Sequence, residues 1–142
     1  MKSVPMLILA AIGAMASVVT ASAQYIRIPQ FSLLQAEQAA GRRIFSDHCA
    51  SCHMQKSGAQ VVFGPSLAGV VGRRAGSLKE FPYSEALKKS GLVWTEDNLR
   101  KWIADSKQMI PNTLMPHVSI SDSAEQLYLV AYLKALKSSG AR

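Results

Sequence analysis

The chain has 142 residues and only two cysteines, Cys49 and Cys52. A small exported domain often relies on a framework of disulfides, and two cysteines three positions apart cannot build one. A structural zinc site takes about four protein ligands. The histidines at 48, 53 and 117 could complete such a site only as a strained mixed set. The scarcity of cysteine therefore excludes a disulfide scaffold and argues against zinc.

Acidic residues are also scarce, since nine Asp and Glu stand against sixteen Lys and Arg, which gives a formal net charge of +7. The basic residues form no long run and occur instead in pairs, at 42–43, 73–74, 88–89 and 100–101. A nucleic-acid partner is therefore not expected. A positive field can still steer a protein toward acidic partners or anionic membrane surfaces in a salt-dependent way, so peripheral membrane association stays open.

The one long apolar run, residues 4–19, is interrupted by Pro5 and is shorter than the roughly 20 residues that a membrane span needs. A charged start at Lys2 precedes this run, and a small-residue site ending at Ala23 follows it. This order is typical of a secretory signal peptide. We expect residues 1–23 to be cleaved and the mature protein to be exported to the periplasm. An uncleaved membrane anchor is the alternative.

The mature residues 24–142 are enough for one small domain. We expect an N-terminal arm over residues 24–34, extended over 24–31 because Pro29 blocks regular helix, and a single domain over 35–142. Ser32 and Gln35 resemble a capping box, which predicts a helix over about 33–47.

Further helices are predicted by caps and by apolar spacing. Ser84 can cap a short helix that Gly91 ends, Thr95 can cap a helix over about 96–107, and Asp122 can cap a last helix that reaches about residue 137. The side chains expected to be buried are Leu34, Ile44, Phe45, Leu99, Trp102, Ile103, Leu129, Tyr132, Leu133 and Leu136. The sequence shows no convincing strand or repeat. The expectation is an all-α domain whose long loops wrap around something.

The stretch Cys49-Ala-Ser-Cys52-His53 has the spacing of a c-type haem attachment site. Each thiol can add to one vinyl group of the porphyrin, and the next residue then lies under the ring, where the His53 imidazole can ligate iron. A disulfide or half of a zinc site is the alternative, but neither would require a histidine directly behind the second cysteine. A haem would also supply the apolar interior that a small domain without disulfides needs.

The other face of the iron needs a ligand, and a methionine there raises the reduction potential and suits electron transfer. Met115 is the leading candidate because Pro111 and Pro116 stiffen its loop. Met109 is a second candidate, and His117 would give a bis-histidine iron of lower potential. Met54 directly follows His53, so it starts on the same face of the haem as His53 and not on the face that needs a ligand. Each methionine could instead be ordinary core packing.

From residue 38 to residue 137 the chain resembles a class I c-type cytochrome of the mitochondrial or bacterial c2 type. Gly41 and Phe45 match the glycine and aromatic of that family's first helix, and Tyr132 matches the aromatic of its last helix, which crosses at the glycine. Residues 64–76 match its G-P-x-L-x-G-x-x-G-R-x-x-G loop. Met115 follows His53 by 62 residues, which is the family spacing.

The resemblance implies a cytochrome c fold, with a small helical domain wrapped around one haem c that is bound through two thioethers. It implies that the Pro65 carbonyl accepts a hydrogen bond from the His53 ring and fixes it. It also implies that Arg73, Tyr83 and Trp94 face a haem propionate, an anion that is costly to bury unpaired. Thr113 is expected to bond near the methionine.

The chain departs from the family pattern at several positions. Leu87 stands where an asparagine of a buried polar network is common, and Trp102 stands where a tyrosine often faces the methionine, which together predict a drier site. Leu114, Val62 and Asp122 occupy positions where partner-binding lysines are common. The positive residues that remain around the haem edge are Arg43, Lys107 and Lys56.

These features predict an exported monohaem electron carrier in a respiratory or photosynthetic chain, and not an enzyme. Its iron, ligated by His53 and Met115, is expected to cycle between Fe(II) and Fe(III). The expected partners are a bc1-type complex, a terminal oxidase or a periplasmic dehydrogenase, reached through acidic docking surfaces. The alternatives are a cytochrome subunit of a dehydrogenase, a membrane-tethered cytochrome, and a peroxidase or gas-binding haem protein with an open sixth position.

Overall fold

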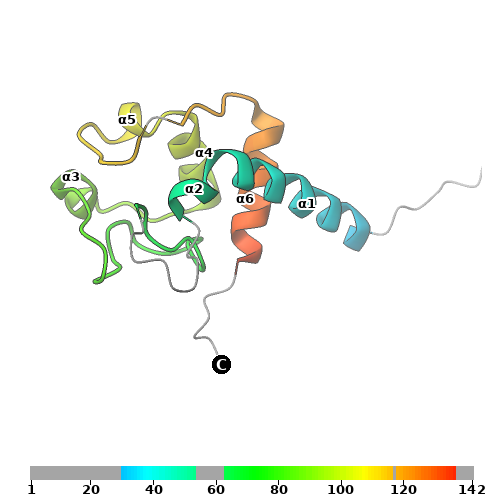
Figure 1. Ribbon diagram of the computed structural model, residues 1–142, viewed down its shortest axis with the longest axis horizontal. Coiled ribbons are helices and arrows are strands. Elements are labelled where there is room, and N and C mark those ends of the chain that lie inside the picture. The colour runs from blue at the N-terminus through cyan, green and yellow to red at the C-terminus, as the bar shows by residue number, and fades with distance from the viewer. Residues whose placement is uncertain (1–29, 54–62, 117, 137–142) are drawn as a thin grey trace, which may run out of the picture.

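The computed structural model of the protein describes residues 30–53, 63–116 and 118–136 (Figure 1). The predicted signal peptide, arm residues 24–29, Met54, Lys56, Val62 and His117 lie outside the described residues.

The described residues fold into helices joined by long loops and contain no strand, which confirms the predicted all-α class. The nearest thing to a sheet is a single antiparallel bridge between Arg74 and Val93. The helices are α1 (Gln30–His48), α2 (Ala50–His53), α3 (Glu85–Lys89), α4 (Glu96–Ala104), α5 (Ser106–Met109) and α6 (Ser123–Ala135).

Helices α1 and α6 cross in the middle of the fold, as Figure 1 shows. Gly41 makes the crossing close, because a β-carbon at this position would overlap the carbonyl oxygen of Tyr128 and lie 2.8 Å from Cβ of Tyr132. One turn further along α1, the rings of Phe45 and Tyr132 pack with their centroids 5.3 Å apart. The crossing expected at Gly41 is therefore confirmed.

The prediction for the start of α1 was wrong. The helix begins at Gln30, so residues 30 and 31 are helical rather than extended, and Ser32 lies inside the helix instead of capping it. Proline is excluded from a helix interior but not from its edge, so Pro29 does not prevent a helix that begins at the next residue. Leu34 was expected to be buried and is exposed, because the first turns of α1 extend past α6, away from the other helices (Figure 1).

The predicted helix caps form as the sequence indicates. The side chain of Ser84 accepts a hydrogen bond from the Leu87 amide at the start of α3, and that of Thr95 accepts one from the Asn98 amide at the start of α4. Asp122 accepts from two amides at the start of α6. After α3, Gly91 takes a positive φ of 68°, a conformation that favours glycine.

Two predicted helix ends were too late. The helix expected to run to residue 107 ends at Ala104, because the Asp105 carboxylate accepts from the amides of Lys107 and Gln108 and so caps a new short helix, α5. The last helix ends at Ala135.

The core lies between α1, α4 and α6 and the loops that follow α2. Leu99, Trp102 and Ile103 of α4 are buried, as are Leu129 and Leu133 of α6. The α4 residues are the stripe that the sequence predicts, and in the predicted α6 stripe Tyr132 and Leu136 are only half-buried. No helix among the described residues combines the length and apolar character that crossing a membrane takes.

Replacing Gly41 by alanine should lower the free energy of unfolding of the haem-loaded protein by about 2 kcal/mol or more, since the added methyl overlaps backbone of α6. In an uncrowded helix, alanine in place of glycine would raise stability by about 1 kcal/mol. A loss of stability would therefore show that the added methyl group is crowded by α6. Denaturant titration measures it. Ala39→Ser, on the exposed side of the same helix, is the control and should change stability by less than about 0.5 kcal/mol. A Gly41→Ala variant as stable as the parent would contradict the close crossing.

Candidate functional site

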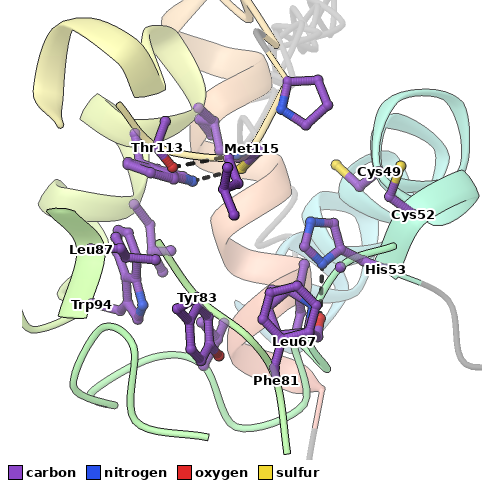
Figure 2. Close-up of a pocket in the computed structure, with 18 of the residues that line it drawn as sticks. Cys49, Cys52, His53, Leu67, Phe81, Tyr83, Leu87, Trp94, Thr113 and Met115 are labelled. Carbon is purple, nitrogen blue, oxygen red and sulfur yellow. Dashed lines mark hydrogen bonds between the residues drawn. The ribbon is translucent and has the colours of Figure 1, made fainter. Parts of the chain in front are cut away.

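A pocket with a cavity volume of about 300 Å³ opens between α2, α4, α6 and the loops around residues 64–83 and 113–116. The walls are mostly aliphatic and aromatic side chains, and the exceptions include Cys49, Cys52, His53 and Arg73. Figure 2 shows His53 and Met115 pointing into this pocket from different segments of the chain. The structure thus brings together the four residues that the sequence singles out, Cys49, Cys52, His53 and Met115.

Both cysteines are carried to the pocket by one turn of helix. The amide of Cys49 continues α1 by donating to the Phe45 carbonyl at 2.9 Å, and the amides of Cys52 and His53 both donate to the Cys49 carbonyl, at 3.1 and 2.9 Å. This turn, α2, was not predicted. The two thiols are free and lie beside the His53 ring (Figure 2). Burial, with a smaller contribution from Cys52, raises the pKa of Cys49 to about 11, so its thiol is neutral at physiological pH.

The His53 ring is fixed on two sides. Its Nδ1 lies 2.8 Å from the Pro65 carbonyl oxygen, a bond in which the ring nitrogen donates. A β-carbon on Gly64 would lie 2.6 Å from Cε1 and 2.7 Å from Nδ1 of the ring. The role expected for Pro65 is therefore confirmed. Because Nδ1 carries the proton, Nε2 is left with a lone pair that can ligate a metal.

The protonation of His53 also suits a ligand. Burial lowers its pKa, and the hydrogen bond to Pro65 opposes that shift. A neutral imidazole is the form that binds metal.

The Met115 sulfur is held by α4. The indole Nε1 of Trp102 donates to the Met115 Sδ at 2.9 Å, and the Met115 amide donates to the Thr113 hydroxyl at 3.4 Å. Trp102 therefore faces the methionine, and Thr113 bonds close to it, as expected. Met109 packs against the core but does not line the pocket, which favours Met115 over Met109 among the described methionines.

The wall near Met115 is apolar apart from that indole and the Thr113 hydroxyl. Leu87 is buried there in place of a polar side chain. Trp94 packs its ring edge to face against Trp102, with centroids 5.1 Å apart and planes at 63°. The Trp94 ring thereby restricts how Trp102 can turn, and with it where the Trp102 N–H points.

Arg73 and Tyr83 also line the pocket. The Arg73 guanidinium donates to the carbonyls of Ser66 at 2.7 Å and Ala68 at 3.0 Å, which ties the loop together. Burial raises the pKa of the Tyr83 phenol, and the charge of Arg73 opposes this. The phenol therefore remains a hydrogen-bond donor at neutral pH. The expectation that Arg73, Tyr83 and Trp94 meet a haem propionate stays a prediction.

The pocket fits a haem by its own chemistry. Two thiols, an imidazole with a free ring nitrogen and a thioether sulfur line a cavity that is otherwise mostly apolar. Gly64 leaves the room in which the His53 ring lies against the backbone.

Comparisons with known proteins agree with this geometry. The sequence model of the family described as cytochrome c matches residues 38–137. The chain belongs to the cytochrome c family. It is 37% identical over 106 residues to cytochrome c2 of Blastochloris viridis, which covers 75% of this chain and 83% of that protein. It is 44% identical over 88 residues to cytochrome c2 iso-2 of Magnetospirillum fulvum, covering 62% of this chain and 91% of that protein.

A solved structure is similar as well. Cytochrome cH from Methylobacterium extorquens superposes with a TM-score of 0.61 at 41% sequence identity, over 69% of this chain and 97% of that one. The chain therefore has the all-α cytochrome c fold and carries one covalently bound haem c, for which Cys49 and Cys52 supply the attachment motif. It is a monohaem electron carrier.

Replacing Gly64 by alanine should destabilise the haem-loaded protein by about 1–3 kcal/mol, because the methyl group would push the His53 ring away from the Pro65 carbonyl. Thermal unfolding measures the change. Ser77→Ala, at an exposed position further along the same loop, is the control and should stay within about 0.5 kcal/mol of the parent. Equal stability of the Gly64→Ala variant would mean that the ring is not held there.

Proposed function

We propose that this chain is an exported one-electron carrier whose haem iron is ligated by His53 and Met115. The bound haem supplies an iron that takes up and releases one electron. The proposal rests on two hydrogen bonds that each hold one of these two side chains in the same pocket. The Pro65 carbonyl holds the His53 ring, and the Trp102 indole holds the Met115 sulfur.

The residues of the chain have separate tasks in this proposal. Cys49 and Cys52 bind the porphyrin through thioether bonds, so that the cofactor is not lost. His53 presents Nε2, and Met115 presents its sulfur. A methionine ligand raises the potential relative to a second histidine.

The pocket walls suit electron transfer better than catalysis. His53 and Met115 would hold the haem iron between them, which would leave no position on it for a substrate. The buried side chains of Leu87, Trp94 and Trp102 exclude water from the methionine side. Little solvent then has to reorient when the charge on the iron changes. An enzyme with an open sixth position is the less favoured reading, because Met115 is held inside the pocket.

Location and partners extend the proposal. The apolar leader supports export to the periplasm. A bc1-type complex, a terminal oxidase or a periplasmic dehydrogenase would exchange electrons with the haem edge, and the positive net charge of +7 favours acidic surfaces for the long-range encounter.

The second candidate is a subunit of a periplasmic dehydrogenase or a membrane-tethered cytochrome. Leu33 and Leu34 favour it, because both are exposed near the start of α1, where a second surface could cover them. Mass analysis of the native protein separates these readings, since a tethered form keeps residues 1–23 and a subunit purifies only in a complex.

Met115→Ala should leave the haem attached but convert low-spin iron to high-spin and lower the reduction potential, on the order of 0.1 V or more. Optical spectra and a redox titration measure both. Met109→Ala is the matched control and should keep the parent spectrum. The opposite order, in which Met109→Ala changes the spin state and Met115→Ala does not, would mean that the wrong methionine was chosen.

Trp102→Phe should lower the potential by roughly 40 mV, the one-electron equivalent of one net hydrogen bond of about 1 kcal/mol. Without the N–H donor, the Met115 sulfur donates more strongly to the iron and favours Fe(III). Trp102→Tyr, which keeps a donor, should recover part of the loss. An unchanged potential in Trp102→Phe would show that the indole N–H does not act on the sulfur.

A further inference from the structure

The two tryptophans of the chain, Trp94 and Trp102, pack against each other in the wall of the pocket. Their rings meet edge to face, and the two side chains are 7% and 6% exposed. An indole has a single hydrogen-bond donor, and that of Trp102 is directed at the Met115 sulfur (Figure 2). Because this N–H lies in the plane of the ring, the direction of the bond depends on how the Trp102 ring is turned. The contact with Trp94 therefore helps to decide where the N–H points.

Trp94 is held in place by its own main chain. Its amide donates to the Arg73 carbonyl at 2.9 Å, and its carbonyl accepts from the Gly72 amide at 2.8 Å. These bonds belong to the stretch that forms the isolated antiparallel bridge of the fold. Hydrogen bonds on both sides of one residue fix its backbone, and with it the direction in which the side chain leaves the chain. Trp94 is thus a fixed support against which the Trp102 ring rests.

The loop that holds Trp94 also holds the histidine side of the pocket. The Arg73 guanidinium donates to the carbonyls of Ser66 and Ala68. Ser66 directly follows Pro65, whose carbonyl accepts from the His53 ring. The support of the histidine and the support of the methionine through the two tryptophans therefore start from one loop.

The family resemblance gives Trp94 another expected role, in which it faces a haem propionate. The two roles depend on different parts of the same side chain. A hydrogen bond to a propionate needs the indole N–H, whereas the support of Trp102 needs only an aromatic ring at this place. A phenylalanine keeps the ring and loses the N–H, so substitutions can separate the two roles.

We propose that Trp94 is a positioning residue for the iron ligand Met115, and that its ring acts by directing the Trp102 N–H toward the Met115 sulfur. This inference rests on the proposed function and adds to it a residue that acts through another. An edge-to-face aromatic contact changes an equilibrium constant by about two- to tenfold. Loss of the Trp94 ring should therefore weaken the hold on Met115 by a measurable factor.

The first experiment measures how readily added imidazole displaces Met115 in the haem-loaded ferric protein. In this exchange the iron–sulfur bond breaks, an iron–nitrogen bond forms and the oxidation state stays the same. Loss of the methionine-to-iron charge-transfer absorption reports it. Trp94→Leu should bind imidazole about fivefold more tightly than the parent, because the sulfur is held less firmly. Trp94→Phe keeps a ring against Trp102 and should stay within about twofold of the parent.

Phe45→Leu is the matched control. Phe45 is also a buried ring in an aromatic pair, with Tyr132, and neither of these two residues lines the pocket. The variant should lose stability but bind imidazole within about twofold of the parent. A fivefold gain in imidazole affinity in this variant would overturn the inference, because general loss of packing would then explain the result for Trp94→Leu.

The second experiment repeats Trp94→Leu in the Trp102→Phe variant, which has no indole N–H to direct. In this background the substitution at position 94 should change the imidazole affinity by less than about twofold, since the two residues act as one unit. A fivefold change in both backgrounds would overturn the inference, because Trp94 would then act on the iron site without Trp102. Unchanged affinity of Trp94→Leu in the parent background would overturn it as well.

Two outcomes concern Trp94 itself. Equal gains in imidazole affinity for Trp94→Leu and Trp94→Phe would overturn the inference and assign the effect to the Trp94 N–H, as a bond to a propionate requires. If Trp94→Leu yields no haem-loaded protein, Trp94→Met takes its place with the same expected values, because a methionine adapts to fill the space that the ring leaves.

The parent spectrum separates this inference from the proposed function. A ferric parent without the methionine-to-iron absorption would refute ligation by Met115, and with it the proposed function. A parent that has this absorption, together with a Trp94→Leu variant that behaves like Phe45→Leu, would refute only the role of Trp94.

Discussion

The carbonyl oxygen of Tyr128 occupies the space in which a β-carbon at position 41 would lie, and this close approach of α1 to α6 determines where the haem site forms. Helix α1 leads through Cys49 directly into the single turn of α2, which ends at His53. Leu129 and Leu133 of α6 line the same pocket. A wider separation of the two helices would move the attachment turn away from the wall that it faces. The close contact at Gly41 thus fixes the helix that leads, about three turns further along the chain, to His53.

The two sides of the pocket use opposite means to hold their iron ligands. His53 is held by backbone, since the Pro65 carbonyl accepts its proton and Gly64 gives its ring room. Met115 is held by a side chain, the Trp102 indole, which itself packs against Trp94. Backbone restraints survive most substitutions, whereas an indole can be replaced in one step. The methionine side is therefore the side on which sequence changes can adjust the potential while the attachment of the haem stays intact.

Much of this structure could be predicted because the signals are local. The caps at Ser84, Thr95 and Asp122 need only the amides of the following turn, and the attachment motif needs only five residues. The errors have two origins, a missing distant contact at Leu34 and a local cap at Asp105 that the sequence reading overlooked. Leu34 is apolar at a helical spacing, but α1 extends past the partner that would bury it. Asp105 could have been one more helical residue, and instead its carboxylate starts α5. The pairing of Trp102 with Met115 was expected only from the family resemblance, because nothing near either residue in the sequence indicates it.

Tryptophan at position 102 determines whether a proton can be passed along the polar contacts that start at the Met115 sulfur. An indole nitrogen gives a hydrogen bond and cannot take one, so the chain of polar contacts that starts at the Met115 sulfur stops at its first member. A hydroxyl in that place could pass a proton onward to neighbouring acceptors, and an indole has no such relay. The Trp102 indole therefore offers no route along which a proton could be passed to or from the Met115 sulfur.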